Sequence, residues 1–113
     1  MKVSFEGIGE MVATFPVTEE LEKGCMVKLD EDGCVSPCVD GDEFIGMAVN
    51  SRQGFAGVQF AGMAQVAYSG IAPGCGWVKL SADGNGGVKA DENGHEYLVV
   101  AADTTAATAV VRL

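Results

Sequence analysis

The fold is decided by a stretch that occurs twice: Gly24-Cys25-Met26-Val27-Lys28-Leu29-Asp30-Glu31-Asp32-Gly33, and again Gly74-Cys75-Gly76-Trp77-Val78-Lys79-Leu80-Ser81-Ala82-Asp83-Gly84. Both versions contain Gly-Cys followed by Val-Lys-Leu-x-x-Asp-Gly. The alternation of apolar and polar residues in Val-Lys-Leu is typical of a strand, and Asp-Gly is a strong signal for a tight hairpin turn. Each stretch therefore predicts a strand, a turn and the start of a returning strand.

The similarity continues beyond these stretches. Residues 40–45 match residues 93–98, and the same register then runs without a gap to the C-terminus, which pairs Phe44 with Tyr97 and Val58 with Val111. This predicts an internal two-fold repeat of residues 24–60 and 74–113, preceded by an N-terminal strand segment at residues 1–23. Chance similarity is the alternative, because Val-x-Leu-x-x-Asp-Gly is a common sequence pattern in hairpins. The long ungapped register favours duplication.

Length and composition limit the architecture. A chain of 113 residues is expected to form one domain, residues 1–113, and its 16 Gly against 3 Pro suit many tight turns between short strands. Two copies are too few for a solenoid, whereas two β-units that bury a face against each other form a barrel or a sandwich. We expect an all-β fold, a small compact β-barrel or β-sandwich of about eight short strands.

Three local expectations accompany this fold. A short helical turn is expected at residues 18–23, and a bend is expected at Gly62, inside a long apolar run at residues 55–68. The aromatic residues in predicted strands are expected in the core; they are Phe44, Phe55, Phe60, Trp77 and Tyr97.

The charge limits the partners. Seven basic and 16 acidic side chains give a net charge of −9. Nucleic-acid affinity comes largely from Lys and Arg that neutralise phosphates, and anionic membranes attract basic segments, so neither partner is expected. No signal-peptide pattern is found, because Glu6 stands where an apolar core would be required. The protein is expected not to be secreted, and its four cysteines are expected to be thiols.

Cysteine spacing is the strongest hint of a metal site. Cys25, Cys34 and Cys38 could be ligands, with Cys75 or His95 as the fourth. However, only one Cys-x3-Cys pair exists, and residues four apart in a strand lie about 13 Å from each other, too far to share one metal ion. Only a tight turn at Pro37 would rescue the site. We expect no metal ligands and no cofactor.

Other motifs are interpreted as turns. Residues 83–87 and 91–94 resemble fragments of calcium loops, but the terminal Glu and the flanking helices of an EF-hand are missing. The same Gly-rich stretch lacks the Lys-Ser/Thr of a phosphate loop. His95 is the only histidine and is interpreted as a turn residue. With no catalytic residues assignable, the protein is not expected to be an enzyme.

A family resemblance follows from three features: the spaced Gly24, Val27 and Leu29, then Gly41-Asp42-x-x-Ile45-Gly46-x-Ala48, and then a Gly-punctuated run that ends near Tyr68-Ser69-Gly70. Over about two-thirds of the chain this pattern resembles the head-decoration, or capsid cement, proteins of tailed bacteriophages and prophages. The resemblance implies a small β-rich domain that binds the outer face of an expanded capsid, often as a trimer, and catalyses nothing.

The sequence thus leads to a functional hypothesis: a structural capsid decoration protein that stabilises the head shell. Its expected partners are itself, as a homotrimer, and the major capsid protein. Its expected location is the virion surface, or the bacterial cytoplasm during assembly. Gln59, Met63 and Gln65, of mixed character, are candidates for an interface. The alternative is a non-enzymatic β-barrel binding or accessory module of another bacterial assembly.

Overall fold

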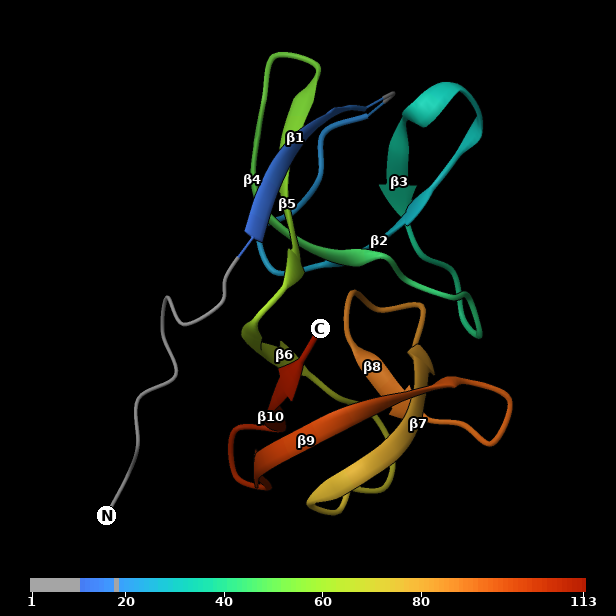
Figure 1. The fold of residues 1–113 in the computed structure, drawn as a ribbon, viewed down its shortest axis with the longest axis vertical. Helices are drawn as coiled ribbons and strands as arrows, with labels where there is room; N and C mark the ends of the chain where they lie inside the picture. Colours follow the sequence, from blue (N-terminus) through green and yellow to red (C-terminus); the bar gives the residue numbers. More distant parts are fainter. Residues whose placement is uncertain (1–10, 18) are drawn as a thin grey trace.

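The computed structural model describes residues 11–17 and 19–113, and in this part of the chain the fold is all-β (Figure 1). Two five-stranded antiparallel sheets contain, in spatial order, β1 (Met11–Pro16), β5 (Phe55–Ala61), β4 (Gly46–Arg52), β2 (Met26–Leu29) and β3 (Val35–Pro37), and then β6 (Met63–Ala67), β10 (Thr108–Arg112), β9 (His95–Asp103), β7 (Gly76–Ala82) and β8 (Val88–Ala90). A 3-10 turn, η1 (Glu31–Gly33), is the single short helix among the described residues. The expected fold class is confirmed, with ten strands instead of about eight.

The two sheets have the same strand order. The order β1-β5-β4-β2-β3 becomes β6-β10-β9-β7-β8 when every strand is replaced by the strand five places later. Each sheet also closes on itself, because an isolated parallel bridge joins Val17, just after β1, to Val35 of β3, and another joins Tyr68, just after β6, to Val88 of β8. We therefore call residues 11–61 the first barrel and residues 63–113 the second barrel; Figure 1 shows one above the other.

Small and β-branched side chains fill the barrels, as narrow interiors require. Two buried clusters contain them. One consists of Leu21, Val27, Val35, Ala48, Ala56 and Val58 of the first barrel. The other consists of second-barrel residues with three residues of the first: Ala64, Val66, Leu80, Ala82, Val88, Val99, Ala109 and Val111, with Met26, Cys38 and Phe44.

The register of the repeat differs by two residues from the sequence expectation. In the first barrel Ala48 pairs with Val58 beside a bulge, and in the second Val99 pairs with Val111 beside a bulge. Val58 and Val111 are thus counterparts, as expected. Ala48 and Val99, however, lie 51 positions apart and not 53. The two extra residues lie in the longer loop between β9 and β10, so Tyr97 is the counterpart of Gly46 and not of Phe44.

Two local expectations can be compared with the structure. Gly62, with a φ of 90°, falls between β5 and β6 and divides the run at residues 55–68 between the two barrels. Residues 19–23 form no helix; there, the backbone N–H of Leu21 donates to Ser51 Oγ at 3.1 Å. β1 confirms a strand at residues 11–16, and the rest of the expected N-terminal strand segment before it lies outside the described residues.

The barrels meet at a junction built largely by residues 38–44 of the first barrel. Phe44 stacks on Tyr97 with ring centroids 4.8 Å apart. The backbone N–H of Gly41 donates to the carbonyl oxygen of Ala82 at 2.9 Å, and Ala82 N–H donates to the carbonyl oxygen of Asp42 at 3.0 Å. These bonds extend the edge of the second barrel with a piece of the first.

Charged pairs flank the stacked rings. Lys89 Nζ lies 2.7 Å from an Asp40 carboxylate oxygen, and His95 contacts the Glu43 carboxylate. Asp40, Glu43 and His95 are exposed and Lys89 is half-buried, so the pairs contribute little to stability. The apolar contacts therefore dominate the junction.

Replacing Phe44 should disrupt the junction. Phe44 is 4% exposed, so we expect Phe44→Ala to lower the free energy of unfolding by about 3–5 kcal/mol. Phe55 is 54% exposed at a hairpin end, and Phe55→Ala should change it by less than about 0.5 kcal/mol. Urea denaturation measures both. Equal losses for the two variants would contradict the importance of the stacked pair.

Candidate interaction surface

The four cysteines differ in burial and form no disulfide with one another. Cys38 is buried, Cys25 and Cys34 are half-buried, and Cys75 is exposed; all four are free thiols. Within residues 11–17 and 19–113, no three His, Cys, Asp or Glu side chains come together as possible metal ligands. His95, the other residue considered as a ligand, begins β9 and contacts Glu43 across the junction.

Burial makes two of the thiols poor nucleophiles. It raises the pKa of Cys38 to about 12, and the neighbouring Asp42 carboxylate acts in the same direction. Burial also raises the pKa of Cys25 above its ordinary value. Because the thiolate is the reactive form, neither residue has the lowered pKa of a catalytic cysteine.

The turns that resemble calcium loops are held by their own aspartates. Asp83 Oδ1 accepts from the backbone N–H groups of Asn85 and Gly87, and its other oxygen binds Ser69 Oγ at 2.5 Å. Asp91 Oδ1 likewise accepts from the Asn93 N–H at 2.9 Å, and its other oxygen binds a serine hydroxyl. These hydrogen bonds lower the pKa of Asp91. Such side-chain-to-backbone bonds explain the Asp and Gly residues as turn chemistry.

One shallow hollow lies at an end of the first barrel, lined by Val17, Glu19, Glu20, Ser51, Gln53 and Gly54. Its hydroxyl, on Ser51, already accepts the backbone N–H of Leu21. In the described part of the chain, every buried polar side-chain atom also has a hydrogen-bond partner. The hollow therefore offers no unpaired buried group that could bind or activate a substrate.

The outer surface of the second barrel is more informative. Strand pairing aligns four outward-facing residues in a row across the sheet, which we call the second-barrel row: Trp77, Leu98, Arg112 and Met63. The same pairing in the first barrel aligns a first-barrel row of Met26, Met47, Gln59 and Val12. The two rows occupy equivalent positions, because corresponding strands pair in the same order.

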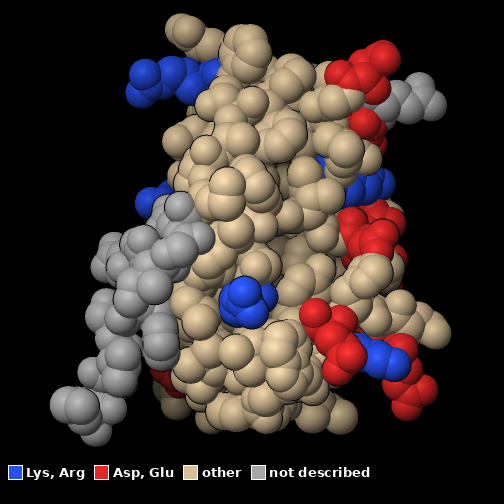
Figure 2. Space-filling view, in the orientation of Figure 1, with Lys and Arg blue, Asp and Glu red and all other residues tan. Residues whose placement is uncertain are grey.

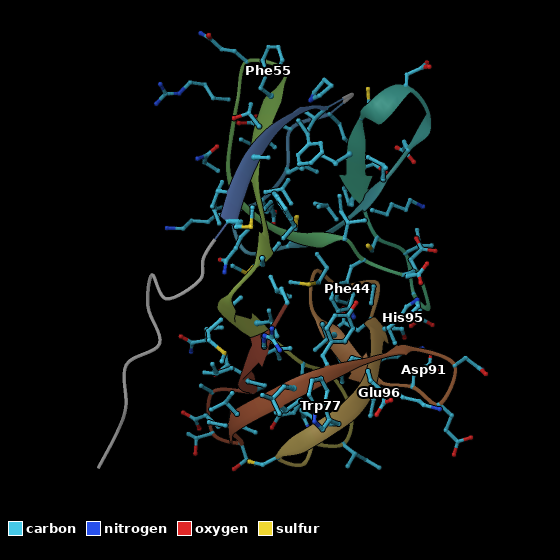
Figure 3. All side chains as sticks on the ribbon, viewed as in Figure 1. Phe44, Phe55, Trp77, Asp91, His95 and Glu96 are labelled. Atoms are coloured by element: carbon cyan, nitrogen blue, oxygen red, sulfur yellow. The ribbon has the colours of Figure 1, made fainter. Side chains whose placement is uncertain are left out.

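The two rows differ at two equivalent positions, where Met26 and Gln59 are buried and Trp77 and Arg112 are exposed. Met26 is 1% exposed at the junction, and its backbone N–H donates to the carbonyl oxygen of Gly86 in the second barrel at 3.0 Å. Gln59 is buried beside it and donates through Nε2 to the carbonyl oxygen of Met63 at 2.9 Å. Trp77, the counterpart of Met26, is 63% exposed. Figure 3 shows Phe44 between the barrels and Trp77 lower on the second barrel, away from the junction.

The uncovered row adjoins one charged pair, because Lys79 and Glu96, two residues along β7 and β9 on the same face, are both exposed. Figure 2 shows Asp and Glu gathered along one edge of the molecule in this view. Of the four residues in the row, only Arg112 is charged, and Leu98 and Met63 are half-buried. An exposed Trp beside apolar residues and one Arg is the composition that binding sites on protein surfaces favour.

These findings correct two sequence expectations. Trp77 and Phe55 were expected in the core and are exposed, and Phe60 is 38% exposed, whereas Phe44 is buried and Tyr97 half-buried. Gln59, expected at an external interface, belongs to the internal junction. Gln65 is exposed and donates to Thr108 Oγ1, and Met63 lies at the end of the uncovered row.

Comparison of the chain with protein-family models and with curated protein sequences finds no match. Residues 11–17 and 19–113 also contain no helix long and apolar enough to span a membrane.

The burial differences predict an order of thiol reactivity. In the native protein, Cys75 should react first with a thiol-specific reagent at neutral pH, and Cys38 last, because Cys38 is buried with a pKa of about 12. Mass spectrometry of peptides after timed labelling measures the order. All four residues should react alike in denaturant. Equal native labelling of Cys38 and Cys75 would contradict the buried position of Cys38.

Proposed function

We propose that this chain is a structural protein without turnover, a capsid decoration protein of a tailed bacteriophage or prophage that binds the outer face of the head shell and stabilises it. The observation that carries the proposal is the uncovered second-barrel row, an apolar surface with a Trp and an Arg on a rigid sheet. A surface of this kind suits association with another protein, whether a capsid subunit or a further copy of the chain, whereas catalysis requires a concave site with convergent polar groups.

The chemistry of the rest of the molecule supports a binding role. The hydroxyl of Ser51 in the hollow of the first barrel accepts the backbone N–H of Leu21, and the aspartates of the Gly-rich turns accept backbone N–H groups. The net charge of −9 favours a basic protein partner over nucleic acid. The major capsid protein and further copies of this chain are the proposed partners, as a homotrimer on the virion surface.

The residues that carry the family resemblance have structural roles consistent with the proposal. Gly41 and Asp42 lie in the loop between β3 and β4, which contacts the second barrel. Gly41 has a φ of 87°, a value that favours glycine. Asp42 accepts the Val39 N–H and Lys28 Nζ, each at 2.9 Å. The resembling motif thus builds the contact between the barrels.

The test uses particles of the major capsid protein from the same genome, assembled with and without this chain. We expect decorated particles to have the chain accessible to protease on their outer surface and to withstand higher temperature or stronger shear. Electron microscopy and thermal release of the packaged contents measure the two effects.

Two other outcomes are informative. Particles that neither bind the chain nor gain stability would refute the capsid proposal and leave an accessory barrel module of another bacterial assembly as the better interpretation. Binding without any gain in stability would refute only the stabilising role. A chain with Phe55→Ala, which changes an exposed residue far from the second-barrel row, is the control for nonspecific surface effects.

A further inference from the structure

The junction inside the chain brings together two different surfaces. One is the first-barrel row around Met26. The other is the end of the second barrel that includes Leu80 and Tyr97, which pack in one buried cluster with Met26 and Phe44. Because the barrels have the same topology, each barrel has a version of both surfaces. The junction buries Met26 and Gln59 of the first-barrel row and the end of the second barrel. The second-barrel row and the end of the first barrel remain uncovered.

The first uncovered surface is the second-barrel row. Its leading residue, Trp77, occupies the place that Met26 has in the first barrel, since Trp77 pairs with Leu98 as Met26 pairs with Met47. Met26 is 1% exposed, and Trp77 is 63% exposed. An apolar position that is covered in one barrel is therefore open in the other.

The second uncovered surface is the matching end of the first barrel. Leu29 is the counterpart of Leu80, two residues after the equivalent pairs Val27–Gly46 and Val78–Tyr97. Leu80 is 2% exposed, whereas Leu29 is 54% exposed. In the second barrel, the turn after this strand supplies the Gly86 carbonyl oxygen that accepts from Met26. In the first barrel, the corresponding turn at residues 30–33 follows Leu29 directly.

We propose that a second copy of this chain places the Leu29 end of its first barrel on the second-barrel row, so that the copies associate head to tail. The contact would repeat, between chains, the contact that already joins the two barrels within one chain. This inference deepens the proposed function, on which it rests for its biological setting, by naming the surface through which the copies associate.

Symmetry supports a head-to-tail contact. If a two-fold axis related the barrels, equivalent rows would meet and both would be buried. Met26 and Gln59 of the first-barrel row are buried, whereas their counterparts Trp77 and Arg112 are exposed, so the arrangement is heterologous and leaves one complementary surface at each end. Repetition of a heterologous contact closes into a ring or continues as a filament, according to the rotation between copies.

Charge favours this partner. The second-barrel row contains Arg112, which is exposed, where the first-barrel row has the uncharged Gln59. The turn next to Leu29 contains Asp30 and Asp32, both exposed. The contact would therefore bring Arg112 toward these two carboxylates, an attraction that favours association and fixes its direction.

Two blocked variants test the direction of the contact. Trp77→Ala removes the row's main apolar group, and Leu29→Asp places a charge at the other end. We expect each variant alone to weaken self-association more than tenfold. When mixed, they should form a 1:1 dimer that grows no further, because one intact surface remains on each chain. Sedimentation velocity over a range of concentrations measures both effects.

The controls have matched exposure. Phe55→Asp changes a residue that is 54% exposed, as Leu29 is, and Ile71→Ala removes an apolar side chain that is 85% exposed outside the row. Both should associate as the unaltered chain does. Trp77 is the only tryptophan, so its emission in the unaltered protein should also shift to shorter wavelength as the copies associate, which tests the contact if a variant fails to fold.

Three results would overturn the inference. They are an unaltered chain that stays monomeric at high micromolar concentration, a Trp77→Ala chain that associates normally, or blocked variants that fail to complement each other. These measurements use the chain free in solution. Failure of capsid binding with intact self-association would therefore refute the proposed function alone, and the reverse result would refute this inference alone.

Discussion

The burial of Met26 and Phe44 against the second barrel is the constraint on which the molecule depends. Each barrel is only five short strands around small side chains, and a core of that size excludes little apolar surface from water. The junction enlarges the core, because Met26, Cys38 and Phe44 join the second barrel's own cluster. The two barrels therefore stabilise each other, and their relative orientation follows from where these three side chains lie.

Local signals in the sequence predicted individual strands and turns well, because strands and tight turns depend on neighbouring residues. Val-Lys-Leu followed by Asp-Gly marks β2 and β7 with the turns after them. The register between the repeats was predicted less well. It depends on loop length, and the two additional residues between β9 and β10 shift β9 against β4 without altering the alternation of either strand. An ungapped alignment cannot detect a length difference of two, because it preserves which side chains face inward.

The candidate surface could not be predicted for a related reason. Alternation separates the two faces of a strand, but it does not identify which apolar outer residue will be covered by a second unit. Met26 and Trp77 both directly precede the Val-Lys-Leu pattern, and the sequence treats them alike. Only the three-dimensional arrangement distinguishes them, since it places a barrel over one and solvent over the other. The repeat itself still carries information. When two repeated units contact each other without two-fold symmetry, one of the two equivalent contact surfaces remains uncovered.

The difference in burial between Met26 and Trp77 also explains why an exposed Trp is compatible with a stable fold. Trp77 is 63% exposed and belongs to neither buried cluster, so the stability of the barrels does not depend on burial of its side chain. Scattered apolar residues on a protein surface need no explanation, but Trp77 is aligned with Leu98 and Met63 in a row that crosses four adjacent strands. Arg112 lies within the same line, where its charge limits nonspecific aggregation while leaving the flanking apolar groups available. A directional, partly charged strip of this kind suits ordered association better than indiscriminate hydrophobic contact.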